Sequence, residues 1–306
     1  MPRKSLVDVL FQEIIDEIID YFEDDKESLI SCTRTCLAFL PRAQSHIFRY
    51  VSITTHRLED PDESEELITI PTRRIETLSD IVKKRPTLPR NFRILNLEIS
   101  DDGAWLSQDI KFTSIMTLLD RSKERFPAIS ITGENLDMPY VLFPNQPEFR
   151  TSFWKPLVAP FVTKLVLENF EDIPIGIFLT CPLLRSLKVD FISIDTNNTF
   201  GASQEGGLPQ LETFEFHHCS EAVDDIFGLV NSDKPHLNPG FLRSLELSPH
   251  GGNPLSCSPR LMAAAGRSLE NLVIDDIECK ESHSLACESP NLLPLQVALC
   301  CRPFSI

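Results

Sequence analysis

One spacing of hydrophobic residues recurs along most of the chain from residue 92 onward. An apolar residue is followed by two others, a second apolar residue, one further residue and a third apolar residue. The clear copies are Phe92-Leu95-Leu97, Val162-Leu165-Leu167, Leu184-Leu187-Val189, Leu211-Phe214-Phe216, Leu242-Leu245-Leu247, Leu269-Leu272-Ile274 and Leu292-Leu295-Val297. A weaker copy lies at Phe126-Ile129-Ile131. From Val162 on, the copies start at residues 162, 184, 211, 242, 269 and 292, so the intervals are 22, 27, 31, 27 and 23 residues.

Each copy predicts a short β-strand. Because side chains alternate along a strand, Leu187 and Val189 are expected to point into a core while Lys188 and Asp190 point out. The intervals lie near the period of leucine-rich repeats, about 20 to 29 residues. Alternating strands and helices would also suit an ordinary α/β enzyme. The repeated triplet favours instead an α/β fold in which irregular leucine-rich-repeat-like units stack, each covering its neighbour's apolar face.

The first fifty residues follow a helical pattern. Ile14, Ile15, Ile18, Ile19 and Phe22 form an apolar stripe on one predicted helix. An acidic break at 24–25 can cap a second helix, and a proline at position 41 suits the first turn of a third. A strand is predicted over 50–53. A unit of about forty residues buries too little surface to be stable alone, so it must lean on the rest of the chain or on a partner.

The segment that follows is acidic and broken by proline between residues 59 and 66, which is typical of a linker or edge loop. A helix is predicted over 72–84, ending at Lys83, Lys84 and Arg85 before Pro86. The sequence therefore predicts three parts: a helical unit over 1–53, a linker and helix over 54–90, and the repeat-like domain over 91–306.

The charge balance narrows the classes of partner. The chain carries 29 Lys and Arg against 45 Asp and Glu, a formal net charge of -16. Such a chain repels phosphate backbones and anionic lipid, so neither nucleic acid nor a membrane is expected as partner. Nine cysteines form no regular disulfide framework, and neither a signal peptide nor an apolar span is apparent. We therefore expect a cytoplasmic or nuclear protein with reduced thiols.

The helical unit resembles a known family. Leu10-Phe11-Gln12-Glu13-Ile14-Ile15, Ile18-Ile19, Leu29-Ile30-Ser31-Cys32 and Thr35-Cys36-Leu37-Ala38-Phe39 together resemble an F-box. The continuation from Leu40-Pro41-Arg42-Ala43 to Ile53 is similar to the F-box variant of basidiomycete, mushroom-forming fungi. In that family such a box is commonly joined to irregular leucine-rich repeats. Phe39 stands where many relatives have tryptophan, and Phe11 stands where the family usually has proline.

The resemblance implies a function. An F-box binds the Skp adaptor of a cullin-based ubiquitin ligase, so the chain would be a non-catalytic subunit that recruits a target protein. By position in the motif, the candidates for the adaptor contact are Leu10, Ile14, Ile18, Leu29, Cys32 and Phe39. The alternative is a repeat scaffold for protein interaction that does not engage a ubiquitin ligase.

The outward residues of the predicted strands form a candidate surface for the target. The charged and imidazole-bearing members are Glu168, Lys188, Asp190, Glu215, His217, Glu246 and Asp275. Because acidic groups outnumber basic ones, we hypothesise that this face binds a protein segment carrying Lys or Arg. The alternative is that the face is simply solvated.

No pattern demands catalysis or a cofactor. His217-His218-Cys219 and the Cys279, His283, Cys287 spacing lack further ligands at matching spacing, so neither predicts a metal site. The sequence contains neither a phosphate-cradling glycine loop nor a nucleophile elbow. We expect no enzymatic activity.

Overall fold

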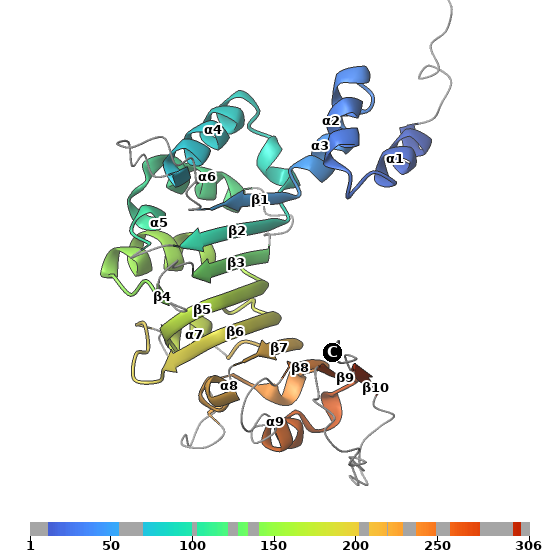
Figure 1. Cartoon of the computed structure of the whole chain (residues 1–306). Coiled ribbons are helices and arrows are strands. Elements are labelled where there is room, and N and C mark those ends of the chain that lie inside the picture. Colours follow the sequence, from blue (N-terminus) through green and yellow to red (C-terminus); the bar gives the residue numbers. More distant parts are fainter. Residues whose placement is uncertain are drawn as a thin grey trace, which may run out of the picture.

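A computed structural model describes residues 12–54, 70–99, 103–121, 128–133, 141–201, 208–218, 220–228, 237–248, 258–275 and 296–300. Within these residues the chain is an α/β protein built on one parallel sheet (Figure 1). The strands are β1 (Tyr50–Ile53), β2 (Ile94–Ile99), β3 (Ala128–Gly133), β4 (Val141–Leu142), β5 (Lys164–Pro174), β6 (Ser186–Asp195), β7 (Thr213–His217), β8 (Ser244–Ser248), β9 (Asn271–Asp275) and β10 (Gln296–Cys300).

The strands add to the sheet in the order in which they occur in the sequence. The order is β1-β2-β3-β5-β6-β7-β8-β9-β10, and the short β4 pairs with β5 off this path. The triplets explain the register, because their second and third apolar residues pair across neighbouring strands, as with Leu187↔Phe214 and Val189↔Phe216. The weaker copy at 126 also becomes a strand, β3.

The predicted boundary at residue 53 separates β1 from β2, although the two strands pair in one sheet. β1 was assigned to the helical unit, yet Val51 and Ile53 pair with Leu95 and Leu97 of β2. Both side chains belong to the main hydrophobic core. The sheet therefore begins inside the first predicted part, and the connection from helix to sheet is only a few residues long.

The last triplet was predicted two residues too early. The pairing of β10 with β9 sets Val297 against Leu272 and Leu299 against Ile274, where Leu295 and Val297 were expected. A shift of two residues keeps the alternation of the strand, so the pattern alone cannot distinguish the two registers. Leu292 and Leu295 lie outside the described residues.

Three strands are followed or interrupted by a residue in the left-handed region. The φ angles are 63° for Asn169, 48° for Phe191 and 51° for His218, each directly after the last outward residue of its triplet. The kink returns the next residue to the core, where Phe170 and Ile192 pair and are buried. Cys219, expected at the same place in the next unit, lies outside the described residues.

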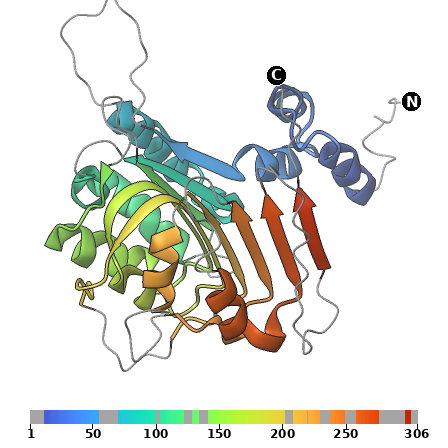
Figure 2. The same ribbon diagram turned by 60° about the horizontal axis from the view of Figure 1, so that its bottom comes forward.

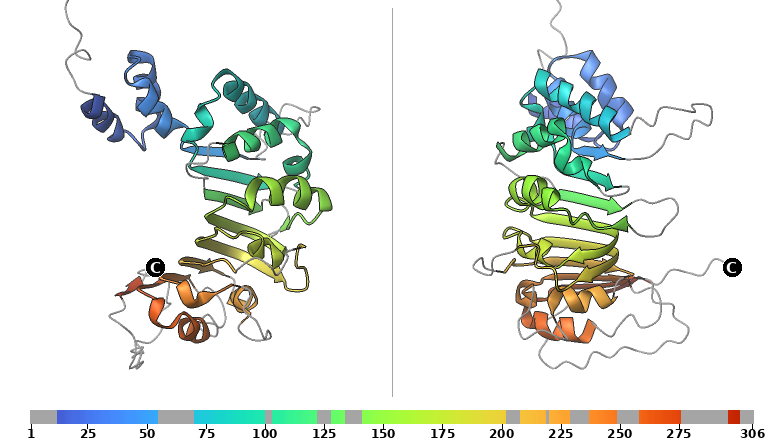
Figure 3. Two further views of the ribbon diagram at one scale, coloured as in Figure 1. Left: turned by 180° about the vertical axis from the view of Figure 1, so that it is seen from behind. Right: turned by 90° about the vertical axis from the view of Figure 1, so that its left-hand side faces the viewer.

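Helices gather on one side of the sheet, and α1 to α3 lie beyond its first strand (Figures 2 and 3). The α-helices are α1 (Gln12–Asp20), α2 (Lys26–Thr35), α3 (Leu40–Ile47), α4 (Ile70–Lys84), α5 (Trp105–Gln108), α6 (Ile110–Arg121), α7 (Gly176–Leu179), α8 (Ser220–Phe227) and α9 (Ser258–Ala265). The three N-terminal helices and the helix predicted over 72–84, which begins at Ile70, are confirmed. None of the helices in the described ranges is long and apolar enough to cross a membrane.

Irregular helical turns complete the layer. They are η2 (Leu88–Asn91), η3 (Phe149–Val158), η4 (Pro239–Phe241) and η5 (Gly266–Ser268). η3 is a π-helix that contains Pro156, and its wider turn suits a residue that has no N–H to donate. Phe149, Phe153 and Trp154 on η3 are fully buried in the main core. The pattern of apolar residues does not predict an element over this segment.

The three N-terminal helices enclose a core of their own. Ile15, Ile19, Leu29 and Ala43 are buried together, separately from the main core. Asp25 caps α2 by accepting a hydrogen bond from the Ser28 amide at 3.0 Å. The unit joins the sheet where the carbonyl of Arg49 accepts hydrogen bonds from the amides of Arg93 and Ile94.

Candidate functional site

The sheet face opposite the buried triplets carries polar side chains. This face is here called the open face and consists of the outward residues of β1, β2, β3, β5, β6, β7 and β8. Six of the seven predicted face residues lie on it. Lys188 pairs in register with Glu215, Glu215 pairs with Glu246, and on the next row Glu168 pairs with Asp190 and Asp190 with His217. The side chain of Asp275, the seventh, is outside the described part of the structure.

Glu215 is the centre of this row. Nζ of Lys188 lies 2.7 Å from its Oε1 atom, and Nε2 of His217 lies 3.2 Å from the same oxygen. All three side chains are mostly buried. The His217 contact and then Lys188 lower the pKa of Glu215 to about 2, while Glu215 raises the pKa of His217. Glu215 is therefore ionised at neutral pH.

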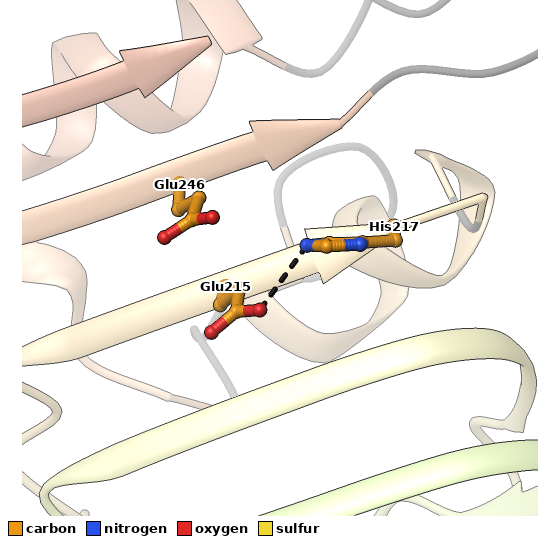
Figure 4. A group of neighbouring side chains, drawn as sticks. All are labelled: Glu215, His217 and Glu246. Atoms are coloured by element: carbon orange, nitrogen blue, oxygen red, sulfur yellow. Dashed lines mark ion pairs between the residues drawn. The ribbon is translucent and has the colours of Figure 1, made fainter. Parts of the chain in front are cut away.

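Glu246 extends the row onto β8. Its side chain is half-buried and lies directly beside Glu215 on the neighbouring strand. His217 follows two residues after Glu215 on β7 (Figure 4). Within the described part of the chain, no hydrogen bond or ion pair compensates this carboxylate. The charged row, defined here as Glu168, Lys188, Asp190, Glu215, His217 and Glu246, thus holds more negative than positive charge.

A stacked aromatic pair borders the row. The rings of Phe191 and His218 lie 4.0 Å apart at an interplanar angle of 8°, and Nδ1 of His218 lies 2.9 Å from Oδ1 of Asp190. Both residues have positive φ, which is unusual for a bulky side chain. The stack and the Asp190 contact hold that conformation. Sequence reasoning missed Phe191, because alternation alone places it on the inner side of the strand.

A polar groove continues the open face over the first strands. It has a volume of about 410 Å³, and its floor is formed by hydroxyl, amide and carboxylate side chains. They include Ser52, Thr54, Asn96, Glu98, Ser130, Thr132, Glu168 and Asn169. Sequence reasoning did not single out the groove, although the outward positions of β1 to β3 were the signal that marks it. Glu168 belongs to both the groove and the charged row.

The predicted adaptor contacts divide into two groups. Ile14 and Ile18 lie on the outer side of α1, with 42% and 46% of their surfaces exposed. Tyr21, 89% exposed, continues their spacing, and sequence reasoning did not single it out. Cys32 and Phe39 are partly buried against the core of the helical unit. Leu10 and Phe11 lie outside the described residues.

Leu29 requires a correction. It was expected at the adaptor contact, but only 1% of its surface is exposed because it packs between Ile15, Ile19 and Ala43. A helix unit this small must use its most central side chain to hold its own core. Leu29 therefore supports the unit and offers no surface to a partner.

Asp20 fixes the orientation of α1 against α3. Its carboxylate accepts from Nε and Nη2 of Arg42 at 2.5 and 2.6 Å, and Nε2 of His46 lies 2.7 Å away. The Arg42 contact is the largest cause that lowers the pKa of Asp20 to about 2. A carboxylate at the C-terminal end of a helix opposes the helix dipole, and the guanidinium of Arg42 offsets that cost.

Three cysteines whose side chains the structure describes are free. Cys32, Cys36 and Cys181 form no disulfide, and burial raises the pKa of Cys181 to about 12. Such a thiol is not a nucleophile.

Comparison of the chain with protein-family models, with curated proteins and with solved structures finds no match.

Proposed function

We propose that the chain is a non-catalytic, target-recruiting subunit of a Skp–cullin–F-box ubiquitin ligase. In this proposal residues 1–53 are the F-box and dock the Skp adaptor, and the following strands are an irregular leucine-rich-repeat-like domain that binds a target protein. The supporting observation is the outer side of α1. There the helical unit buries Ile15 and Ile19 in its own core and leaves the neighbouring Ile14 and Ile18 about half exposed.

This arrangement suits a partner for an energetic reason. The core of the helical unit is formed without Ile14, Ile18 and Tyr21. These three residues, at helical spacing, still expose apolar surface. Covering that surface releases about 25 cal/mol per Å² of apolar area, so a contact centred on these residues is favourable. Asp20 holds α1 against α3, and a short connection joins α3 to β1. A preordered surface of this kind loses little entropy on binding.

The open face supports the second half of the proposal. Its charged residues are Glu168, Asp190, Glu215 and Glu246 together with Lys188, and a second lysine, Lys164, lies at the start of β5. A protein segment carrying Lys or Arg complements this charge, and the adjacent polar groove offers hydrogen-bond partners along the segment. The open face and the adaptor surface lie on different parts of the chain, so both partners can bind together.

The test is co-purification of the full chain with the fungal Skp adaptor. We expect the wild type to capture the adaptor and the double variant Ile14→Asp, Ile18→Asp to lose capture at least tenfold, since two charges would be buried in the contact. Ile110→Asp is the matched control, because Ile110 is an exposed isoleucine, 81% accessible, on α6. A folded wild type that captures no adaptor would refute the proposal.

A repeat scaffold that does not engage a ubiquitin ligase is the second candidate. The burial of Leu29 favours it, because one residue that the resemblance assigned to the adaptor contact is not at the surface. This candidate predicts that the open face binds its target while the adaptor is not captured. The same co-purification therefore separates the two functions.

A further inference from the structure

Three side chains of the open face offer metal-binding atoms to one point. Oxygens of the Glu215 and Glu246 carboxylates and a ring nitrogen of His217 all lie within 4.8 Å of one another. Figure 4 shows the two carboxylates side by side on β7 and β8, with the imidazole beside them. The donors come from two paired strands, whose register fixes their spacing.

The distances suit a single ion. Metal–oxygen and metal–nitrogen bonds to divalent transition metals are about 2.0 to 2.2 Å, so two donors across one ion are about 4 Å apart. None of the donor separations exceeds this by as much as 1 Å, and the His217–Glu215 separation of 3.2 Å is shorter. Small χ rotations of two glutamates, without any backbone movement, bring the donors into range.

Two of the donors have no partner outside the donor set within the described ranges. Nε2 of His217 is shielded from solvent, and its 3.2 Å approach to Glu215 lacks hydrogen-bond geometry. Glu246 has no ion pair or hydrogen bond within the described ranges. A shielded nitrogen without a hydrogen bond and a half-buried carboxylate without a cation both cost free energy that a bound cation would recover.

The structure assigns Glu215, His217 and Glu246 as a binding site for one divalent transition-metal ion of the Zn²⁺ class. An imidazole with two carboxylates is a borderline donor set, which suits such an ion better than Ca²⁺ or Mg²⁺, whose ligands are all oxygen. Three protein donors leave at least one coordination position for water or for a group of a bound protein. This assignment stands whether or not the chain belongs to a ubiquitin ligase.

Lys188 competes with the metal. Its ammonium group occupies Oε1 of Glu215 at 2.7 Å, so the ion must share or displace it. Removing this positive charge while keeping the length of the side chain is expected to strengthen metal binding. Lys188→Met therefore provides a gain of affinity, which a damaged fold could not produce.

The site could not be predicted from the sequence, because its donors lie on two different strands. His217 was tested with its neighbours His218 and Cys219, whereas the structure pairs it with Glu215, two residues back, and with Glu246 on the next strand. Strand pairing sets the distance between β7 and β8, and residue spacing along the chain does not reveal it. His218 instead contacts Asp190.

Co²⁺ is the probe for the test, because its visible spectrum separates nitrogen and oxygen ligands from thiolate. The full chain is titrated with Co²⁺, and bound Co²⁺ is then displaced with Zn²⁺. We expect one equivalent to bind without a thiolate band. Glu246→Gln and His217→Gln should each weaken binding by roughly tenfold or more, and Lys188→Met should tighten it.

Glu168→Gln is the matched control, since it removes one carboxylate from the same open face outside the donor set. Circular dichroism checks that each variant is folded. The assignment is overturned if no Co²⁺ binds at millimolar concentration or if the spectrum shows thiolate ligands. It is also overturned if Glu168→Gln weakens binding as much as Glu246→Gln, because that result would indicate general attraction by an acidic surface.

Discussion

At the scale of single residues, Asp20 shows how one carboxylate can join two elements that the sequence presents separately. The helical spacing of the apolar stripe from Ile14 to Phe22 leaves Asp20 on the opposite, polar side of the helix, and nothing nearby in the sequence marks it. Its partners, Arg42 and His46, follow 22 and 26 residues later on α3. Only the packing of α1 against α3 brings the three groups together, so this contact could not be predicted from spacing.

Asp20 predicts a pH dependence of the helical unit. Its pKa falls from an ordinary 3.8 to about 2, so its contribution to stability is complete above pH 4 and is lost as the pH falls toward 2. Because the side chains of both Asp20 and Arg42 are more than a third exposed, we expect a contribution of about 1 kcal/mol or less.

Hydrogen exchange of the α1 amides between pH 2 and 5 measures this effect. Asp20→Asn should remove the acid-dependent loosening of α1 and lower its protection above pH 4. Glu17→Gln, on the exposed side of the same helix, should retain the wild-type profile. An unchanged profile in Asp20→Asn would show that the contact does not hold α1.

At the scale of elements, the triplet pattern predicts the strands well, whereas not every segment between them follows a regular period. The strand cores at Leu165, Leu187 and Phe214 were correctly placed because burial on one face imposes a strict period of two residues. The π-helix η3 was not predicted, because its wider turn follows neither the helical nor the strand period. The two-residue error at β10 arises because both registers satisfy the same alternation.

The left-handed residue within β5 gives the element-scale prediction. Asn169 has a φ of 63°, which glycine adopts freely and asparagine tolerates, whereas a β-branched residue clashes with its own backbone. Asn169→Val should therefore lower the free energy of unfolding by about 1 to 3 kcal/mol.

Asn169→Gly is the matched comparison, and we expect it to change the free energy of unfolding by less than about 1 kcal/mol. Urea denaturation followed by circular dichroism measures both variants. Equal losses in the two would indicate that the asparagine side chain, and not the backbone angle, is what matters at this position.

At the scale of the whole molecule, the chain separates two surfaces of different character. The outer side of α1 exposes apolar side chains before the first strand, whereas the charged residues of the open face lie on β5 to β8. Of the candidate site, the sequence predicted the open-face charges and the two exposed isoleucines. It did not predict the burial of Leu29, the Phe191–His218 stack or the convergence of Glu246 on His217, because each depends on contacts between distant elements.

A hydroxyl-radical footprint of the chain, alone and in complex with the Skp adaptor, tests most directly whether the outer side of α1 is the adaptor surface. Tyr21, Ile14 and Ile18 report on the outer side of α1, and Phe191 and His218 report on the open face. We predict that the adaptor protects the α1 reporters and leaves the open-face reporters unchanged. Protection of Phe191 and His218 with no change at Tyr21 would contradict the assignment of α1 as the adaptor surface.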